Sequence, residues 1–348
     1  MSQSPSLVVN ARVTTFAMGG QQRVAAEIMQ RLPGIECLAP AKPLGGLKGH
    51  AWEQVILPVK ARGRLLWSPS ATGPLLHRHQ VLTVHDTAFF DVPEYFAPSF
   101  VRLYQTLVPR LARRVAQVVT VSEFSRQQMV KTMGIAAEKI EVIYNGVSPA
   151  FRPSDPETAA ATRAALDLPE RYLLVQATAD RRKNLARTLE AWRHVAPALP
   201  ADLHLVVSGN LGRGHVFGEA AGLDLDGLRL KAIGYVAEEH MAPLMAGAEA
   251  FVFASLYEGF GLPVLEAMAA GTPVITGNTT ALPEVAGEAA LLVDANSTTS
   301  IAQAMLDVVN RPLLAQTLRT KGVLQAKRFT WDEAARRYGQ IFERLSRR

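Results

Sequence analysis

Cysteine is almost absent from this chain, in which Cys37 is the only one among 348 residues. A lone thiol excludes an internal disulfide framework and a zinc site built on cysteines. It fits a protein of the reducing cytoplasm, which is the location we predict. The chain also lacks any run of about 18 apolar residues, and its N-terminus lacks the basic and apolar segments of a signal peptide, so we expect neither a membrane span nor export.

A strong excess of one charge is also missing, because 37 Lys and Arg residues stand against 31 Asp and Glu, a formal net charge of +6. This modest and dispersed surplus, without a recognition motif, argues against nucleic-acid binding. It suits anionic partners such as nucleotides, diphospholipids or an anionic leaflet, and equally an ordinary, slightly basic surface. The composition, 48% hydrophobic and 20% charged, is otherwise that of a globular protein able to bury two cores.

Two site signatures are missing as well. The Gly-x-Gly-x-x-Gly fingerprint of dinucleotide binding does not occur, which argues against an oxidoreductase. The histidines follow no metal-binding spacing, and we assign no metal ligands. We therefore expect an activity that needs neither a metal nor a bound cofactor.

Apolar, β-branched runs alternate with helical patterns along the chain, which predicts parallel sheets covered by helices. We predict strands at residues 7–10, 81–84, 118–121, 140–143, 172–175, 203–207, 250–253 and 273–275. The pattern restarts near Arg171 after a polar stretch at residues 148–169, where we place a linker. We expect an N-terminal domain at residues 1–155 and a C-terminal domain at residues 165–330, with a binding cleft at the carboxyl edges of their sheets.

The segment richest in chemistry is residues 255–266, Ser-Leu-Tyr-Glu-Gly-Phe-Gly-Leu-Pro-Val-Leu-Glu. It follows a predicted buried strand and opens a predicted helix. Gly259 and Gly261 let the backbone approach a ligand closely, and the N–H groups of a helix start can bind phosphate. Glu258 lies in the loop and Glu266 near the helix start. Taken alone, Glu258 is as well explained as a solvated loop acid as by a role in a site, and Glu266 is as well explained as a first-turn acid favoured by the helix dipole.

This segment resembles the signature of the retaining glycosyltransferases of family 4. Further similar segments are Thr-Val-His-Asp at residues 83–86, Val-Thr-Val-Ser-Glu-Phe-Ser at 119–125, Val-Ile-Tyr-Asn-Gly-Val at 142–147, the stretch ending in Arg-Lys-Asn at 173–184, and Thr-Ala-Leu-Pro-Glu-Val at 280–285. The resemblance covers nearly the whole chain. It implies an α/β fold of the GT-B type, with two Rossmann-like parallel-sheet domains facing across a cleft, and we expect the C-terminal helix, residues 331–348, to return to the N-terminal domain.

On this resemblance the donor is a sugar diphosphonucleotide, whose leaving diphosphate needs cations or aimed N–H groups. Arg182 and Lys183 would supply the cations, although a basic run such as residues 180–183 is often simply solvated. Glu266 would bind the ribose hydroxyls. The other donor-binding residues that the resemblance implies are Gly234, Tyr235 and Val236 beside the base, and Glu258, Gly259, Phe260, Gly261 and Leu262 along the sugar and phosphates.

Two further features lie in the N-terminal half. Gly19 and Gly20 precede a predicted helix and resemble the family's glycine loop between donor diphosphate and acceptor, although alone they equally describe a flexible helix start. His85 ends a predicted strand, and the family match favours a catalytic role over that of a hydrogen-bonded core residue. Asp86 has two open roles, to orient the imidazole or to bind the acceptor.

The full pattern, including residues 66–74 and 91–96, resembles bacterial mannosyl- and rhamnosyltransferases of polysaccharide and lipopolysaccharide assembly. The resemblance implies GDP-mannose as the donor, with UDP-glucose and rhamnose nucleotides as alternatives, and a glycan or polyprenyl-linked acceptor. It implies retention of configuration without a covalent nucleophile. The alternative function is a GT-B-like sugar-nucleotide epimerase, which would need general acid and base residues and no acceptor.

We also expect peripheral contact with the anionic inner face of the membrane. Basic and apolar side chains interleave between residues 99 and 131: Arg102, Arg110, Arg113, Arg114, Arg126 and Lys131 among Phe100, Leu103, Leu107, Val108 and Leu111. Such a mixture can lie on an anionic leaflet. It is equally typical of an amphipathic helix whose apolar face packs on a sheet.

Overall fold

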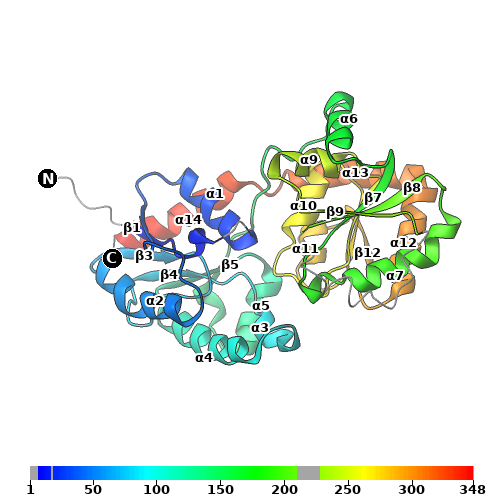
Figure 1. Ribbon diagram of the computed structural model, residues 1–348. Helices are drawn as coiled ribbons and strands as arrows, with labels where there is room; N and C mark the ends of the chain where they lie inside the picture. Colours follow the sequence, from blue (N-terminus) through cyan, green and yellow to red (C-terminus); the bar gives the residue numbers. More distant parts are fainter. Residues whose placement is uncertain (1–6, 17–18, 210–227, 348) are drawn as a thin grey trace. The chain divides into compact units, whose positions relative to one another are not determined.

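The computed structural model describes residues 7–16, 19–209 and 228–347 (Figure 1). The chain forms two compact units, the first made of Met1–Gly146 with Thr330–Arg348 and the second of Val147–Phe329. Each unit contains a six-stranded parallel sheet covered by helices. The α/β class and the parallel sheets predicted from the alternating pattern are confirmed, and so are the two Rossmann-like sheets that the resemblance implies.

The first unit is built on a sheet with the strand order β2-β1-β3-β4-β5-β6. Its strands are β1 (Leu7–Asn10), β2 (Glu36–Leu38), β3 (Leu65–Ser68), β4 (Gln80–Thr83), β5 (Gln117–Thr120) and β6 (Ile140–Val142). Its α-helices are α1 (Gly20–Arg31), α2 (Gly46–Lys60), α3 (Ala88–Asp91), α4 (Pro98–Arg114), α5 (Glu123–Met133) and α14 (Trp331–Ser346). Short 3-10 turns lie at Val13–Thr15, Pro93–Tyr95 and Ala137–Lys139.

The C-terminal helix α14 packs on the first sheet, although it follows the whole second unit in the sequence. The Tyr338 hydroxyl lies 3.0 Å from Thr83 Oγ1, and its ring centroid lies 5.2 Å from that of Trp67. Gly146 lies against the start of α14, since a Cβ there would approach Trp331 N to 2.1 Å. The chain therefore leaves the first unit and re-enters it at the same place.

The second unit has the strand order β12-β11-β10-β7-β8-β9. Its strands are β7 (Arg171–Gln176), β8 (Leu203–Ser208), β9 (Leu230–Gly234), β10 (Ala250–Phe253), β11 (Val274–Gly277) and β12 (Ala290–Val293). Its helices are α6 (Pro156–Ala165), α7 (Leu185–Val195), α9 (Glu238–Ala246), α10 (Leu262–Ala269), α11 (Leu282–Ala286), α12 (Thr298–Asn310) and α13 (Pro312–Ala326), with 3-10 turns at Arg181–Lys183 and Ala196–Ala198.

Alternate residues of β7 face the two helix layers of the second unit. Leu173 and Val175 join the core formed with α7 and α12. Tyr172 points to the other face, where its hydroxyl donates to Leu244 O of α9 at 2.7 Å. Burial on both faces explains why the central strands read as continuous apolar runs.

Three differences from the sequence-based predictions have physical reasons. The edge strands β2, β9 and β12 were missed because they are only half buried, and β3 was missed inside the sheet. The stretch at residues 148–169 is not simply a linker, since it contains α6, capped by Asp155 accepting from Thr158 N at 2.8 Å. The supposed membrane-facing apolar residues of α4, Leu107, Val108 and Leu111, are buried beneath that helix.

Candidate functional site

Lys183 and Glu258 meet at the carboxyl edge of the second sheet. Lys183 ends the 3-10 turn after β7, and Glu258 lies in the loop after β10. Lys183 Nζ lies 2.6 Å from Glu258 Oε1 and 5.0 Å from the centre of the Phe253 ring. Both side chains retain partial exposure, 22% and 14%. Two of the three predicted catalytic residues of this unit, which are Arg182, Lys183 and Glu258, are therefore brought together from positions 75 apart in the sequence.

Asn184 fixes the loop that carries Lys183. Its backbone is left-handed, with φ of 58°, a conformation that asparagine tolerates better than most residues. Its side-chain amide donates to Ala254 O at 2.9 Å and to Ala295 O at 2.7 Å. The loop after β7 is thus tied to the loops that follow β10 and β12, and the direction of Lys183 follows from these ties.

Arg182 is placed differently from Lys183, although the two are neighbours. Its guanidinium pairs with the carboxylate of Asp180, with Nη2 at 2.6 Å from Oδ2. Burial would raise the pKa of Asp180, but the hydrogen bonds and charge of Arg182 outweigh it, so the pKa of Asp180 is lowered. Arg182 is therefore held by a carboxylate two residues away, and a donor diphosphate would have to share it.

Glu266 lies one turn inside α10. The first turn of that helix holds no acidic residue. The alternative explanation of Glu266, a first-turn acid that complements the helix dipole, is therefore excluded. Its side chain is buried, with 7% exposed. A carboxylate in such a place needs a specific partner because its desolvation is costly. Glu266 is therefore a buried acid and not a solvated one.

The start of α10 requires Gly261. This residue has φ of 102°, and a Cβ there would lie 2.7 Å from Leu282 Cδ2 of α11. Leu262 opens the helix directly afterwards, and Phe260 is buried against Phe329, with ring centroids 5.9 Å apart. The loop of residues 258–262 is therefore set by a left-handed glycine and a packed phenylalanine.

Gly209 is a residue of this edge that the sequence analysis missed. It has φ of 117°, and a Cβ there would lie 1.9 Å from Ala177 O. Gly209 N donates to Gly234 O at 2.7 Å, while Ala177 N donates to Ser208 O at 2.9 Å. The loops after β7, β8 and β9 are thus in contact. The signal in the sequence was a glycine placed directly after a buried strand.

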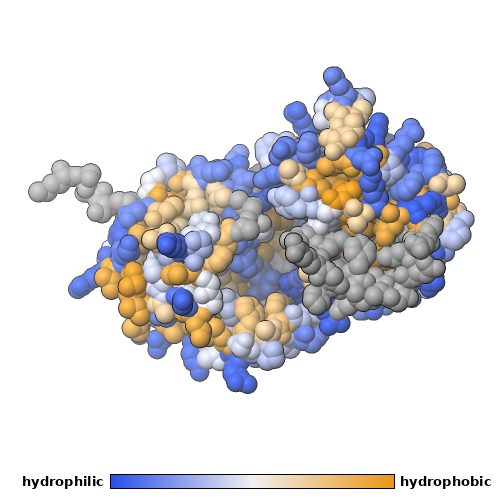
Figure 2. All heavy atoms as spheres, viewed as in Figure 1, coloured by the Kyte–Doolittle hydropathy of each residue, from blue (hydrophilic) through white to orange (hydrophobic). Residues whose placement is uncertain are grey.

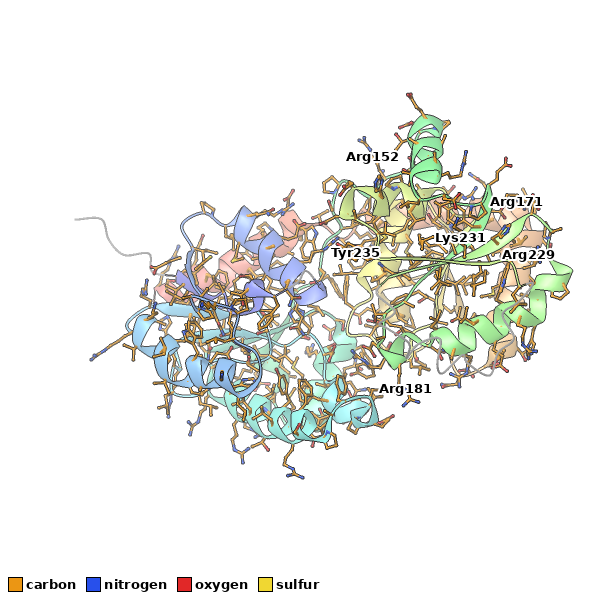
Figure 3. The ribbon with its side chains drawn as sticks, in the orientation of Figure 1. Arg152, Arg171, Arg181, Arg229, Lys231 and Tyr235 are labelled. Carbon is orange, nitrogen blue, oxygen red and sulfur yellow. The ribbon has the colours of Figure 1, made fainter. Side chains whose placement is uncertain are left out.

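The residues predicted beside the nucleoside base lie at the carboxyl end of β9, where Gly234 is the last residue of the strand. Val236 is buried, whereas Tyr235 is 80% exposed and extends from the end of its strand (Figure 3). Gly234 has φ of 69° and no atom within 4 Å of an added Cβ. The structure therefore offers an open aromatic ring at the same edge as Lys183.

Arg171 and Lys231, which are labelled in Figure 3, lie at the opposite, amino edge of this sheet and are already paired. Arg171 binds Glu249 at 2.6 Å and Asp202 at 3.1 Å, and Lys231 binds Asp167 at 2.5 Å. These pairs join the starts of strands to neighbouring loops. They have a structural explanation that needs no ligand.

His85 follows β4 in the first unit and is buried, with 8% exposed. Its Nε2 lies 2.8 Å from Pro69 O, and because a carbonyl only accepts, Nε2 must donate. Burial lowers the pKa of His85 despite opposing effects of Pro69 and Asp86, so the ring is neutral at pH 7 and Nδ1 is left as an acceptor. Asp86 Oδ1 accepts from Ala88 N, the first residue of α3, at 3.0 Å.

Gly19 and Gly20 begin α1, and residues 17 and 18 before them lie outside the described residues. Gly19 caps the helix in an extended conformation, with φ of −147°, which any residue can adopt. Both glycines are exposed. Glycine is therefore not required by backbone strain here, and its effect is to leave the helix start uncovered.

The part of the chain that the structure describes holds no group of three or more His, Cys, Asp or Glu side chains arranged to bind a metal. An Asp-x-Asp spacing does occur in the sequence at Asp224 and Asp226, and it lies outside the described residues. The sequence analysis assigned no metal ligands there.

Comparisons with known proteins agree with this geometry. Residues 61–151 match the family description Glycosyltransferase Family 4, and residues 170–311 match Glycosyl transferases group 1. O-antigen chain mannosyltransferase B of Escherichia coli is 31% identical over 254 residues, which are 72% of this chain and 67% of that protein. Serotype-specific mannosyltransferase WbdA of Escherichia coli is 27% identical over 259 residues, 71% of this chain but only 31% of that relative.

Among solved structures, HepE of Anabaena in complex with UDP and glucose is similar, with a TM-score of 0.76 and 17% identity over 98% of this chain and 100% of that one. A likeness at this identity shows the fold, which is GT-B. Together with the matched family descriptions and the 31% identical relative, it confirms the resemblance on which the assigned residues depend. The chain belongs to glycosyltransferase family 4 and is a glycosyltransferase.

Proposed function

We propose that this enzyme transfers mannose from GDP-mannose, with retention of configuration and without a metal, to a glycan or polyprenyl-linked acceptor in bacterial surface polysaccharide synthesis. The names of the two relatives, an O-antigen chain mannosyltransferase and a serotype-specific mannosyltransferase, support the sugar and the pathway. The donor's nucleotide and the acceptor rest on the resemblance described above.

The observation that carries the proposal is the Lys183–Glu258 pair, with Nζ and Oε1 2.6 Å apart. Negative charge grows on the diphosphate as the bond to the sugar breaks, and a fixed cation stabilises that charge. Glu258 and the Phe253 ring hold the ammonium in one place before the donor arrives. Glu258 can also accept from sugar hydroxyls, while buried Glu266 can distinguish ribose by its hydroxyl pair.

Donor identity can be tested by thermal unfolding with GDP-mannose, UDP-glucose and dTDP-rhamnose. A ligand at 100 times its dissociation constant stabilises the folded protein by about 2.7 kcal/mol. We expect the largest shift with GDP-mannose, and its loss in Glu266→Ala. The matched control is Glu288→Ala, which removes an exposed acid from the same unit. A larger shift with either other nucleotide sugar would contradict the proposed donor.

Transfer can be tested with GDP-mannose and octyl α-mannoside as a synthetic acceptor. NMR of the product should show an α-linked disaccharide, because the donor mannose is itself α-linked and retention preserves that configuration. A β-linked product would contradict retention. The proposed activity would be contradicted if the enzyme formed no mannosylated product but consumed a different nucleotide sugar.

We further propose that α2 is the surface that contacts an anionic leaflet, in place of α4. No helix of the described ranges is long and apolar enough to span a membrane. The exposed side of α2 carries the apolar side chains Leu47, Val55, Ile56 and Val59, and hydrophobic surface gathers over this part of the unit in Figure 2. Lys48, Lys60 and Arg62 are exposed beside them.

Charge complementarity supports this partner. Between residues 37 and 85 the sequence contains one acidic residue, Glu53, and it is fully buried. The exposed cations of residues 37–85 are therefore not neutralised by an exposed acidic residue of the same segment. Each cation near an anionic leaflet contributes about 1 kcal/mol, and apolar side chains that enter the interface add to it.

Sedimentation with liposomes tests this surface. We expect binding to vesicles of phosphatidylglycerol and phosphatidylethanolamine at low salt and weaker binding at high salt. Val55→Ser combined with Val59→Ser should reduce it, whereas Arg110→Ser on α4 should not. Equal and negligible binding to anionic and neutral vesicles would contradict membrane contact and favour a soluble acceptor.

A further inference from the structure

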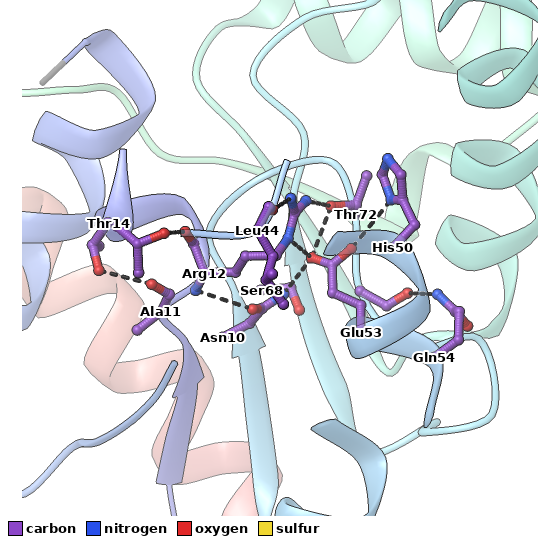
Figure 4. Close-up of polar contacts among 12 residues, drawn as sticks. Asn10, Ala11, Arg12, Thr14, Leu44, His50, Glu53, Gln54, Ser68 and Thr72 are labelled. Carbon is purple, nitrogen blue, oxygen red and sulfur yellow. Dashed lines mark hydrogen bonds and ion pairs between the residues drawn. The ribbon is translucent and has the colours of Figure 1, made fainter. Parts of the chain in front are cut away.

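Glu53 is a charged side chain fully buried in the first unit. It lies on α2 and exposes 0% of its surface. A buried carboxylate is costly unless hydrogen bonds and an opposite charge surround it. Its surroundings, shown in Figure 4, come from three separate segments of the chain.

One oxygen of Glu53 collects contacts from the ends of two strands. Oε1 accepts from Asn10 Nδ2 at 2.8 Å and from Thr72 Oγ1 at 3.0 Å, and it lies 3.0 Å from Arg12 Nε. Oε2 lies 3.4 Å from His50 Nδ1. Burial would raise the pKa of Glu53, but these partners outweigh it, so its pKa is lowered and the carboxylate remains charged at neutral pH.

The guanidinium of Arg12 extends the same network. Nη2 donates to Thr72 Oγ1 at 3.1 Å and Nη1 to Leu44 O at 3.3 Å. A Cβ at Gly49 would approach Arg12 Nη1 to 2.6 Å and Leu44 O to 2.4 Å, so only glycine fits beside it. Arg12 is therefore enclosed on three sides, by the loop after β3, by the segment before α2 and by α2 itself.

The neighbour of Glu53 on α2 holds the same loop. Gln54 Nε2 donates to Gly73 O at 2.8 Å, and its Oε1 accepts from Leu75 N at 3.0 Å. Earlier in that loop, Pro69 O accepts from the His85 ring. The loop after β3 is thus fixed by α2 on one side and fixes the imidazole on the other.

We propose that Glu53 is a positioning residue for sugar transfer, which with Arg12 joins the loop after β1 to the loop after β3 and so orients His85. β1 and β3 are adjacent parallel strands, so these loops emerge side by side at the carboxyl edge of the sheet. A buried ion pair rarely stabilises a fold more than apolar residues would, and its specific contribution is geometry. This inference rests on the proposed function.

The test compares Glu53→Gln with Glu36→Gln. The glutamine side chain in Glu53→Gln keeps the size and one acceptor but loses the charge that Arg12 faces. Glu36 pairs with Arg64 at the starts of β2 and β3, the opposite edge of the same sheet, so its substitution is the matched control. Both proteins and the wild type are assayed with GDP-mannose and octyl α-mannoside, by GDP calorimetry and by hydrogen exchange.

In Glu53→Gln we expect a fall in kcat of about 100-fold, the effect of a misplacement of about 1 Å. GDP affinity should be unchanged because the proposed nucleotide site lies in the second unit. Hydrogen exchange should rise in residues 11–16 and 69–75 and not elsewhere in the sheet. Glu36→Gln should match the wild type in all three measurements.

Two outcomes would overturn the proposal: wild-type kcat in Glu53→Gln, or a loss of activity that follows general unfolding with exchange raised throughout the unit. If Glu53→Gln does not fold, Arg12→Lys serves instead, since it keeps the charge but cannot reach both Thr72 and Leu44. Failure of the proposed function is separate, because it would appear as absent transfer by the wild type.

Discussion

Neighbouring residues of one basic run have different environments in this enzyme. Arg182 is bound to Asp180 two positions away, whereas Lys183 reaches Glu258 on another loop. The first contact is local and could form in a short peptide. The second depends on the tertiary fold, and it sets a compact point charge at the carboxyl edge of the sheet.

We predict that Lys183→Ala lowers kcat by about 100-fold or more while GDP affinity changes much less. The cation matters more in the transition state than in the ground state, because charge develops on the diphosphate as the sugar leaves. Steady-state kinetics and calorimetry check this, with Lys231→Ala at the amino edge as the control. A loss of affinity with kcat preserved would limit Lys183 to binding.

His85 leads to a prediction about pH. Its pKa is lowered in the folded protein, so below about pH 6.5 the unfolded chain binds more protons than the native state. The free energy of unfolding therefore decreases as the pH is lowered through this range. His85→Gln can still donate to Pro69 O but does not titrate. We therefore expect its urea midpoint to fall less than that of the wild type between pH 7.5 and pH 5.5.

Tryptophan fluorescence can follow this unfolding in the first unit. Of the four tryptophans in the sequence, Trp52, Trp67 and Trp331 lie in that unit. His77, whose pKa burial also lowers, is present in both proteins and so cancels in the comparison. Parallel loss of stability in the two proteins would show that His85 does not contribute.

At the scale of elements, the candidate site depends on loops that hold each other at the ends of parallel strands. Gly209 and Ala177 pack so closely that the loops after β7 and β8 have no room for a side chain between them. Asn184 joins two further loops through its amide. These contacts are made by loops and not by the strands themselves, and they fix the positions of Lys183 and Tyr235.

Backbone strain at a positive φ typically costs about 1–3 kcal/mol. We predict that Gly209→Ala destabilises the second unit by more than this, because the alanine would have to adopt a positive φ and its Cβ would also clash with Ala177 O. It should also weaken GDP binding. Gly287→Ala is the control, since that glycine has φ of 54° but faces the flexible side chain of Gln325. Urea unfolding and calorimetry check both effects. Equal destabilisation by the two variants would mean that the clash is relieved at no cost.

At the scale of the whole molecule, two sheets of one design carry different chemistry. The first presents a neutral imidazole and a buried ion-pair network at its carboxyl edge, and the second presents a cation, two carboxylates and an aromatic ring. A division of this kind suits a reaction with one anionic donor and one polyhydroxyl acceptor.

We predict that transfer from GDP-mannose persists in EDTA and is not increased by Mg²⁺ or Mn²⁺. Lys183 and backbone N–H groups would supply the positive charge that a metal supplies elsewhere. Activity assays with chelator, then with each metal added back, check this. Loss in EDTA with recovery on adding Mn²⁺ would contradict it, and Asp224→Asn would then show whether the Asp-x-Asp spacing binds the ion.

The sequence by itself determined the α/β class, most of the central strands and the family, whose pattern supplies the candidate site residues. Continuous apolar runs arise where a strand is buried on both faces, and the paired glutamates with their glycines form a pattern specific enough to identify a family. Half-exposed edge strands such as β2 and β9 leave no such signal, so the sequence could not give the full sheets.

Only the tertiary structure decided which partners the side chains take. The sequence could not reveal that Lys183 pairs with Glu258 or that Gly209 meets Ala177, because these contacts depend on strand order. It also suggested α4 as a membrane surface, whose apolar residues proved to be core, while α2 keeps its apolar side exposed. Periodicity shows that a helix has an apolar face, and packing alone decides whether that face is covered.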